Sequence, residues 1–237
     1  FFSRKSSIKL FPVLPSIKKL IYSCQVGVSA FVGEISSGVI TVTFNMIILN
    51  LAGNTGVAAY GVVANTSLVA VALFNGIAQG SQPLISRSYG RGEEQNVRSL
   101  LKMALTTVLG LVVLLMIFIF FSAPAVTAVF NSEHDLQLAA YADSGLRLYF
   151  IGFLFAGINI VGTAALSAVE SVKYAFCASI SRGFVATIFF AFVLSACFKM
   201  TGIWLAFPAA EFATMFITLS GLLCFTKQKG GMYHAKD

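Results

Sequence analysis

The sequence has few charged residues, and this scarcity limits what the protein can be. Asp, Glu, Lys and Arg together make up 11% of its 237 residues, whereas about 25% is usual in soluble domains. Hydrophobic residues make up 57% of the chain, and the mean hydropathy is +0.86. A water-soluble globule is therefore excluded, and the composition indicates an integral membrane protein.

Residues suited to metal or redox chemistry are also scarce. The two histidines, His134 and His234, lie outside the apolar runs, and the four cysteines are scattered without a CxxC pair. Such cysteines are typical of small core residues. The apolar runs contain no Ser/His, Asp/Asp or metal-ligand set of the kind that an intramembrane enzyme needs. We therefore expect no enzymatic activity, no metal and no cofactor.

Long apolar runs dominate what the sequence does contain. Residues 35–86 carry no charge, and a Gly/Asn/Thr turn at 53–56 is their only interruption. About 20 apolar residues suffice for a helix to cross a bilayer. The pattern predicts an all-α polytopic membrane protein with six transmembrane helices, at 24–50, 57–86, 99–121, 145–169, 176–198 and 202–225.

The basic residues predict how these spans are oriented. We expect a basic interfacial segment at 1–19, a transmembrane lobe at 20–226 and a tail at 227–237. If the N-terminus is cytoplasmic, only Arg147 and Lys199 of the 16 Lys and Arg residues fall near the outer side. Lys and Arg are enriched on the cytoplasmic side of membrane proteins. This bias predicts a multi-pass protein of the plasma (inner) membrane with both termini cytoplasmic and no nucleic-acid partner.

Polar stripes follow the first two predicted spans. The first begins at Glu34 and continues at helical spacing to Asn45, and the second includes Gln79. A charged group within hydrocarbon costs about 2.5–3.5 kcal/mol, so such a group usually faces protein or water and marks a functional pathway. Glu34 is therefore a candidate cation-binding residue, with Asn45 and Gln79 as polar companions. Interhelical hydrogen bonding without a ligand remains open for the uncharged residues.

Two further candidates lie in the later spans. Asn159 is in the fourth span, and Glu211 is about nine residues in from the outer end of the last span, close to the predicted midplane. A structural role for Glu211, paired with Arg182 or with an amide on a neighbouring helix, stays open beside a role in transport. Between the third and fourth spans, Ser132 and Asp135 have the spacing of a capping box, which predicts that Ser132 caps the next helix.

Several motifs in register resemble those of the multidrug and toxic compound extrusion (MATE) family, in the MepA-like and DinF-like bacterial or archaeal branch. They are FVGEISSG at 31–38, GNTGVAAYG at 53–61, NGIAQGSQPLIS at 75–86, YGRG at 89–92 and GIWLAFPAAE at 202–211. The likeness spans essentially the whole chain and is to the C-terminal six-helix half of such a transporter.

This resemblance implies a secondary antiporter that exports organic cations or drugs in exchange for Na⁺ or H⁺. Glu34 matches the family's seventh-helix carboxylate, which in the NorM-like branch helps to bind the coupling cation. Ala156 stands where that branch has a partner acid, so a Na⁺ site of that kind would need Asn159 as a neutral ligand. The implied partners are the lipid bilayer, organic-cation substrates and an N-terminal lobe of the same chain or a second copy. The alternatives are a flippase for lipid-linked substrates and a non-transporting structural half.

Overall fold

The computed structural model describes the backbone of residues 17–233 and the side chains of residues 17, 38–171 and 173–225. The elements are α1 (Ile17–Gly90), α2 (Glu94–Phe130), α3 (Leu136–Ile151), α4 (Phe153–Ala168), α5 (Val172–Ile180), a π-helical turn η1 (Ser181–Val185) and α6 (Ala186–Tyr233). All of these described elements are helical, which confirms the all-α prediction. Residues 1–16 and 234–237, which belong to the predicted basic segment and tail, lie outside the described residues.

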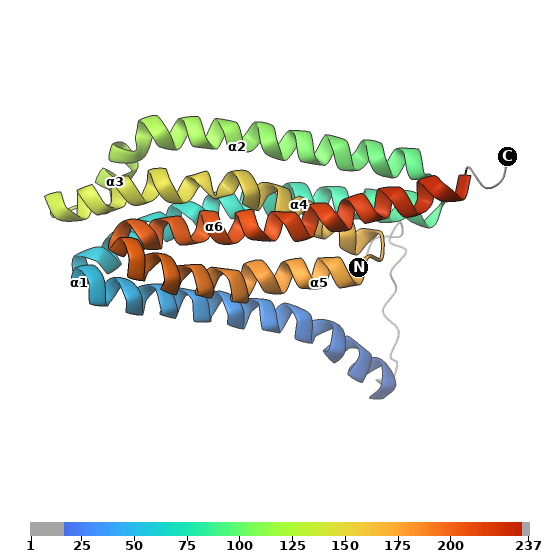
Figure 1. Cartoon of the computed structure of the whole chain (residues 1–237), viewed down its shortest axis with the longest axis horizontal. Helices are drawn as coiled ribbons and strands as arrows, with labels where there is room; N and C mark the ends of the chain where they lie inside the picture. The colour runs from blue at the N-terminus through green and yellow to red at the C-terminus, as the bar shows by residue number, and fades with distance from the viewer. Residues whose placement is uncertain (1–16, 234–237) are drawn as a thin grey trace, which may run out of the picture.

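The two longest helices each break at one residue. The break in α1 is at Gly53 (φ 64°, ψ −158°), and the break in α6 is at Lys199 (φ 53°, ψ −128°). Glycine adopts positive φ at little steric cost, whereas Lys199 carries a Cβ and is strained there. The ribbon reverses direction within both helices (Figure 1). We call 17–52 and 54–90 the two arms of α1, and 186–198 and 200–233 the two arms of α6.

These reversals account for the predicted number of spans. Gly38–Gly90, Glu94–Phe130 and Lys173–Phe225 are long and apolar enough to cross a membrane, and α3 with α4, bent by 44°, forms a fourth such stretch. A straight 53-residue helix would be about 80 Å long, far more than the roughly 30 Å hydrocarbon core. The first and third stretches therefore cross twice each, giving six crossings in the described part of the chain.

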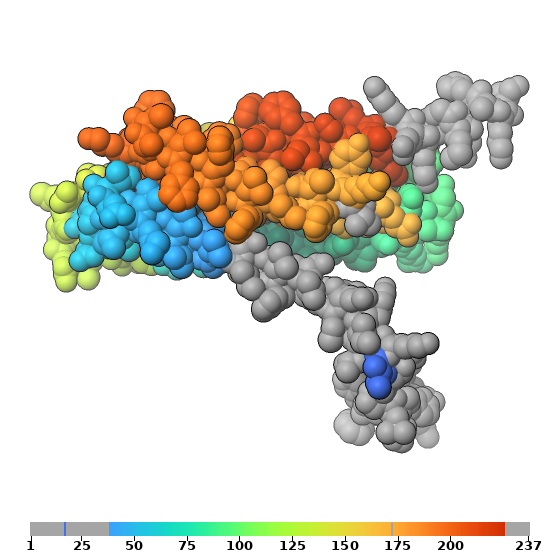
Figure 2. Space-filling model, turned by 60° about the horizontal axis from the view of Figure 1, so that its bottom comes forward, coloured from blue at the N-terminus to red at the C-terminus, as the bar shows by residue number. Residues whose placement is uncertain are grey.

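The connections between the crossings gather at the two ends of the bundle. The turn within α1, the α2–α3 connection and the turn within α6 lie at one end, on the left of Figure 1. The α1–α2 and α4–α5 connections lie at the other. The first arm of α1 runs along the side of the bundle formed by the first arm of α6 (Figures 1 and 2), and α1 also contacts the turn η1. We call the end with the α2–α3 connection the outer end, following the orientation predicted from the basic residues.

The start of α3 corrects one expectation from the sequence. Asp135, not Ser132, is the N-cap, because its carboxylate accepts hydrogen bonds from the backbone N–H groups of Gln137 (2.7 Å) and Leu138 (3.2 Å). The buried Asn131 side chain braces the same residue, accepting from Asp135 N at 3.0 Å and donating to Asp135 O at 2.8 Å. The spacing indicated that a helix starts in this segment but placed its cap, and so its first residue, three residues too early.

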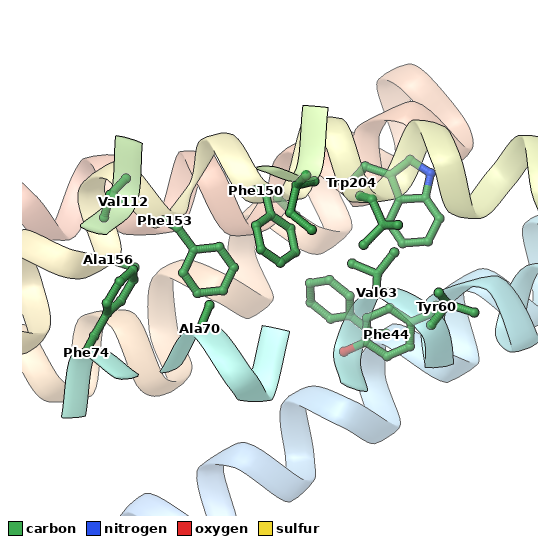
Figure 3. Packing of buried hydrophobic residues seen from close by; sticks show 14 of the residues in the cluster. Phe44, Tyr60, Val63, Ala70, Phe74, Val112, Phe150, Phe153, Ala156 and Trp204 are labelled. Carbon is green, nitrogen blue, oxygen red and sulfur yellow. The ribbon is translucent and has the colours of Figure 1, made fainter. Parts of the chain in front are cut away.

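Aromatic packing fixes the bend between α3 and α4 against α6. A Cβ on Gly152 would lie 2.6 Å from Phe207 Cδ1 and 3.0 Å from Pro208 Cα, so the bend passes α6 at a distance that only glycine allows. The Tyr149 ring stacks on Phe207 with centroids 4.3 Å apart. The largest buried side chains continue this packing through the bundle, with Trp204 near Tyr60 and Phe44, and Phe153 near Phe74 (Figure 3).

Candidate functional site

The second arm of α6 carries a buried polar face. Glu211, Thr214 and Thr218 are spaced at i, i+3 and i+7, which places them on one side of the helix. Glu211 is 2% exposed and both threonines are fully buried. An ionisable group at such a position needs partners from neighbouring helices, because bare burial of a charge is costly.

The π-helical turn η1 supplies the first partner, Arg182. Here the Ala186 N–H donates to the Ser181 carbonyl, an i to i+5 bond, and the Thr187 hydroxyl donates to the Arg182 carbonyl at 2.6 Å. A π-turn widens a helix locally and changes the direction in which its side chains project, and such turns are frequent at functional sites. Ser181 also joins this turn to α6, since its hydroxyl lies 2.9 Å from that of Thr214.

Arg182 and Glu211 form a buried ion pair. Arg182 Nε donates a hydrogen bond to Glu211 Oε1 at 3.1 Å, and Arg182 Nη2 lies 3.0 Å from the same carboxylate oxygen. The two side chains differ in access, because that of Arg182 is 25% exposed and that of Glu211 only 3%. Arg182, the positively charged member of the pair, is therefore the one that a molecule outside the bundle can reach.

Asn159 of α4 completes the shell around the carboxylate. Its Nδ2 donates to Glu211 Oε2 at 2.7 Å and to the Glu211 carbonyl oxygen at 2.8 Å. Its own oxygen is also used, because the Thr218 hydroxyl donates to Asn159 Oδ1 at 2.9 Å. We call Asn159, Arg182, Glu211 and Thr218 the Glu211 network. Every polar side-chain group of Asn159 and both oxygens of Glu211 have partners within it.

A small residue allows α4 and α6 to approach closely enough for these bonds. Gly162 follows Asn159 by three residues, and a Cβ there would clash with Thr218 Cγ2.

Thr163, one turn beyond Asn159, has a buried hydroxyl oxygen with no hydrogen-bond partner among the described residues. Thr163 therefore has an unused oxygen on the same face of α4 as Asn159.

The network both stabilises the lobe and is sensitive to charge. Removing one partner of a buried ion pair typically costs about 3–5 kcal/mol, because the other charge is left unpaired. Neutralising Glu211 with a proton or another cation would remove the attraction that holds Arg182. The arrangement can thus convert cation binding at one carboxylate into release of an arginine on a neighbouring helix.

The structure unites only part of the predicted set of site residues. Asn159 and Glu211 contact each other directly. Asn45 is partly buried on the first arm of α1, and Gln79 is exposed on the second arm; the hydrogen bonds of the Glu211 network include neither. Glu34 lies within the backbone of α1, but its side chain is outside the described residues. The binding roles proposed for all five residues stay predictions.

Some residues of the network were not among the predicted site residues. The sequence predicts Arg182 only as a structural partner of Glu211, and it marks neither Thr218 nor the neighbouring Thr214 as a site residue. The spacing of Glu211, Thr214 and Thr218 was a usable signal, because it repeats the polar stripe found in the first two spans. The π-turn that presents Arg182 has no comparable sequence signal.

Comparison with known proteins assigns this architecture to a family. The sequence model of the MatE family matches residues 30–193, which include part of the first crossing, the next three crossings, α5 and the Arg182 turn. The chain belongs to the MatE family. A comparison with curated protein sequences gives no match.

Solved MATE structures share the fold of this MatE chain at low sequence identity. An inward-facing multidrug resistance MATE transporter of the MOP superfamily is 18% identical with a TM-score of 0.84, covering 97% of this chain and 54% of that one. An outward-facing structure is 17% identical with a TM-score of 0.82, covering 94% and 50%. A MOP superfamily transporter from Pyrococcus furiosus, described by a reversed polarity of its binding pocket, is 17% identical with a TM-score of 0.75, covering 91% and 48%. This chain thus spans about half the length of each.

Proposed function

We propose that this chain forms one lobe of a secondary antiporter that exports organic cations in exchange for Na⁺ or H⁺. In this proposal the Glu211 network is the part of the lobe that responds to the coupling cation. The single observation that carries it is the buried Glu211 carboxylate, held by Arg182 and Asn159 from two other helical elements. Membership in the MatE family supports transport as the general activity.

The proposed coupling follows from the geometry of the ion pair. Arg182 acts as a tethered cation that occupies Glu211 when no other cation is bound there. A proton or Na⁺ reaching Glu211 offsets the charge that attracts the guanidinium, so Arg182 is released and the π-turn is free to repack against α6. Thr163, one turn from Asn159 on the same face of α4, offers an unpaired hydroxyl oxygen for such a cation. Glu34 remains the proposed second carboxylate, on α1.

A flippase for lipid-linked substrates is the second candidate, and one observation favours it. Arg182 is the more exposed member of the ion pair, so an anionic substrate group would meet the guanidinium before the carboxylate. Arginine binds phosphate groups well through its planar array of donors. In that case Arg182, and not Glu211, would contact the substrate.

Substitutions of charged residues in the intact protein separate these functions. In cells expressing equal amounts of each variant, we expect Glu34→Gln and Glu211→Gln to impair resistance to a toxic organic cation. The same change at the exposed Glu133, which belongs neither to the predicted site nor to the Glu211 network, should retain it. Unchanged resistance in both carboxylate variants would overturn the antiporter proposal. Loss of anionic-lipid translocation in Arg182→Gln, with cation resistance intact, would support the flippase instead.

A further inference from the structure

A pocket of about 390 Å³ lies at the outer end of the bundle, between the last turns of α2 and the start of α3. Its wall comes from the segments 124–131 and 134–143, and none of its lining residues belongs to the Glu211 network. Ligand pockets typically measure about 300–1,000 Å³ and are mostly apolar with a few converging polar groups. The volume of this pocket fits that range, and its lining is divided equally between five apolar residues (Pro124, Leu136 and three alanines) and five polar ones.

Two oxygens in the pocket wall have no partner. Thr127 is 2% exposed, yet its hydroxyl oxygen makes no hydrogen bond within the described residues. The same is true of Asp143 Oδ1, which is also buried. Only three side-chain atoms in the described part of the chain are buried without a partner, and two of them line this one pocket. Because buried polar groups are nearly always satisfied, the pair points to a ligand that donates hydrogen bonds.

The charge around the pocket favours a positively charged donor. Residues 131–147 contain three carboxylates (Glu133, Asp135 and Asp143) and one guanidinium (Arg147), which gives −2 with His134 neutral, in a chain whose net charge is +7. Arg147 does not occupy the unpaired oxygen, since its Nη2 lies 3.3 Å from Asp143 Oδ2 and its guanidinium lies over the Phe120 ring, 5.3 Å from the centroid. Asp143 Oδ1 is therefore free to accept from a second cation.

The size and lining of the pocket distinguish between kinds of cation. A metal ion needs several closely spaced ligands, and no group of three His, Cys, Asp or Glu side chains with that geometry occurs among the described residues. A quaternary ammonium could balance the charge but has no N–H group for the two oxygens. A primary ammonium supplies three N–H donors on one atom, and an attached apolar chain would match the alanine-rich wall.

We propose that this pocket binds an amphipathic primary amine, with its ammonium group donating to Asp143 Oδ1 and Thr127 Oγ1. The apolar part lies along Ala128, Ala139 and Leu136 and leaves the pocket where Leu136 is 86% exposed. Such an amine has two possible sources, the ethanolamine headgroup of a membrane lipid or a free alkylamine. The proposal concerns binding at the outer end and does not depend on transport through the Glu211 network.

The test is a binding measurement on the full chain in phosphatidylcholine nanodiscs. The probe is dansylcadaverine, a fluorescent primary amine followed by its anisotropy and displaced by unlabelled octylamine. A lost charge-assisted hydrogen bond corresponds to roughly tenfold weaker binding, and this is the effect expected for Asp143→Asn. Thr127→Val, which keeps the side-chain shape and leaves the Asp143–Arg147 pair intact, should weaken binding about threefold.

The matched control is Glu133→Gln, which removes an exposed carboxylate that does not line the pocket and should leave binding unchanged. Arg147→Gln, which removes the competing cation, should strengthen it. The proposal would be overturned if Asp143→Asn and Thr127→Val both bound dansylcadaverine as tightly as the native protein does. So would displacement by octyltrimethylammonium that matches displacement by octylamine, because that result would mean charge attraction without hydrogen bonding.

Nanodiscs that contain phosphatidylethanolamine identify the source of the amine. If this lipid is the occupant, it competes with octylamine, so more octylamine should be needed to displace dansylcadaverine from the native protein when the lipid is present. This increase should be smaller in Asp143→Asn, because that variant binds the lipid more weakly. If free amines are the occupants, ethanolamine lipid should leave dansylcadaverine binding unchanged. Each result supports a primary-ammonium site and assigns its ligand.

Discussion

The Glu211 network and the outer pocket use the same kinds of side chain in opposite ways. In the network, both carboxylate oxygens and the whole Asn159 amide are hydrogen-bonded, and the helices meet closely at Gly162. In the pocket, Asp143 pairs through one oxygen only, Thr127 has no partner, and there is open volume beside both. A buried carboxylate whose bonds are complete holds the fold in one arrangement until another cation replaces its partner. A carboxylate with an unused oxygen beside a cavity can bind a ligand without any rearrangement.

The largest expected effect comes from breaking the network at its charge. Arg182→Met leaves the Glu211 carboxylate buried and unpaired, and we expect a loss of about 3–5 kcal/mol in the free energy of unfolding. The double variant Arg182→Met/Glu211→Met should recover most of this loss, because the Asn159 amide still has the carbonyl of residue 211. Denaturant titration in micelles, followed by the fluorescence of Trp204, the single tryptophan, measures both. A double variant that loses as much as the two single variants combined would contradict this.

A smaller loss is expected when the amide is removed. Asn159→Leu deprives Glu211 and Thr218 of a shared partner in a fully buried position, and should cost about 1–3 kcal/mol in the free energy of unfolding. The control is Asn65→Ala, an exposed asparagine that donates only to the Gly61 carbonyl of its own helix. The same fluorescence titration should show a change below about 0.5 kcal/mol for this control. Equal effects at the two positions would mean that the network adds nothing to stability.

Helix spacing gives a third test of the comparison. Gly162→Ala places a methyl group against Thr218 and should destabilise the fold by about 1–3 kcal/mol while weakening the Thr218–Asn159 hydrogen bond. Gly110→Ala, in an exposed part of α2 where a Cβ meets nothing within 4 Å, should instead stabilise by about 0.5–1 kcal/mol. Thermal unfolding of the two variants, compared side by side, checks the sign of each. Tolerance of alanine at 162 would show that α4 and α6 can separate freely.

The smallest effect is expected at the outer end. Asp135→Ala removes the N-cap of α3 and should cost about 1 kcal/mol. Ser132→Ala, at the position that the sequence spacing favoured, should have almost no effect. Hydrogen exchange of the first turn of α3 would detect the local fraying directly. A reversed order of the two effects would restore Ser132 as the cap.

The sequence predicted the fold well because the bilayer imposes strong rules on apolar segments. The six spans follow from run length, and the turn at Gly53 coincides with a glycine-rich motif. The second reversal, at Lys199, also falls in the predicted gap between the spans 176–198 and 202–225, but its positive φ was not predictable, because positive φ is unusual for a residue with a Cβ. The basic residues predicted an orientation that the helices alone do not test.

The candidate site was only partly predictable. The place of Glu211 in an apolar span predicted that it is buried. The sequence left two partners possible for its carboxylate, Arg182 or an amide on a neighbouring helix. In the structure the carboxylate is bonded to both. The amide that contacts Glu211 is decided by the rotation of α4 about its axis and by the π-turn. Neither feature produces a periodic pattern in the sequence. The outer pocket left no trace in the sequence, because Thr127 and Asp143 are ordinary residues until packing leaves their oxygens unpaired.

The most direct test of the central claim is transport by the intact protein reconstituted in vesicles. The measurement is export of radiolabelled tetraphenylphosphonium under an imposed Na⁺ or H⁺ gradient, for the native protein and for Glu211→Gln. One of the two gradients should accelerate export by the native protein, and Glu211→Gln should lose this acceleration. Export that is insensitive to both gradients, or a gradient response that is unchanged in Glu211→Gln, would contradict the central claim.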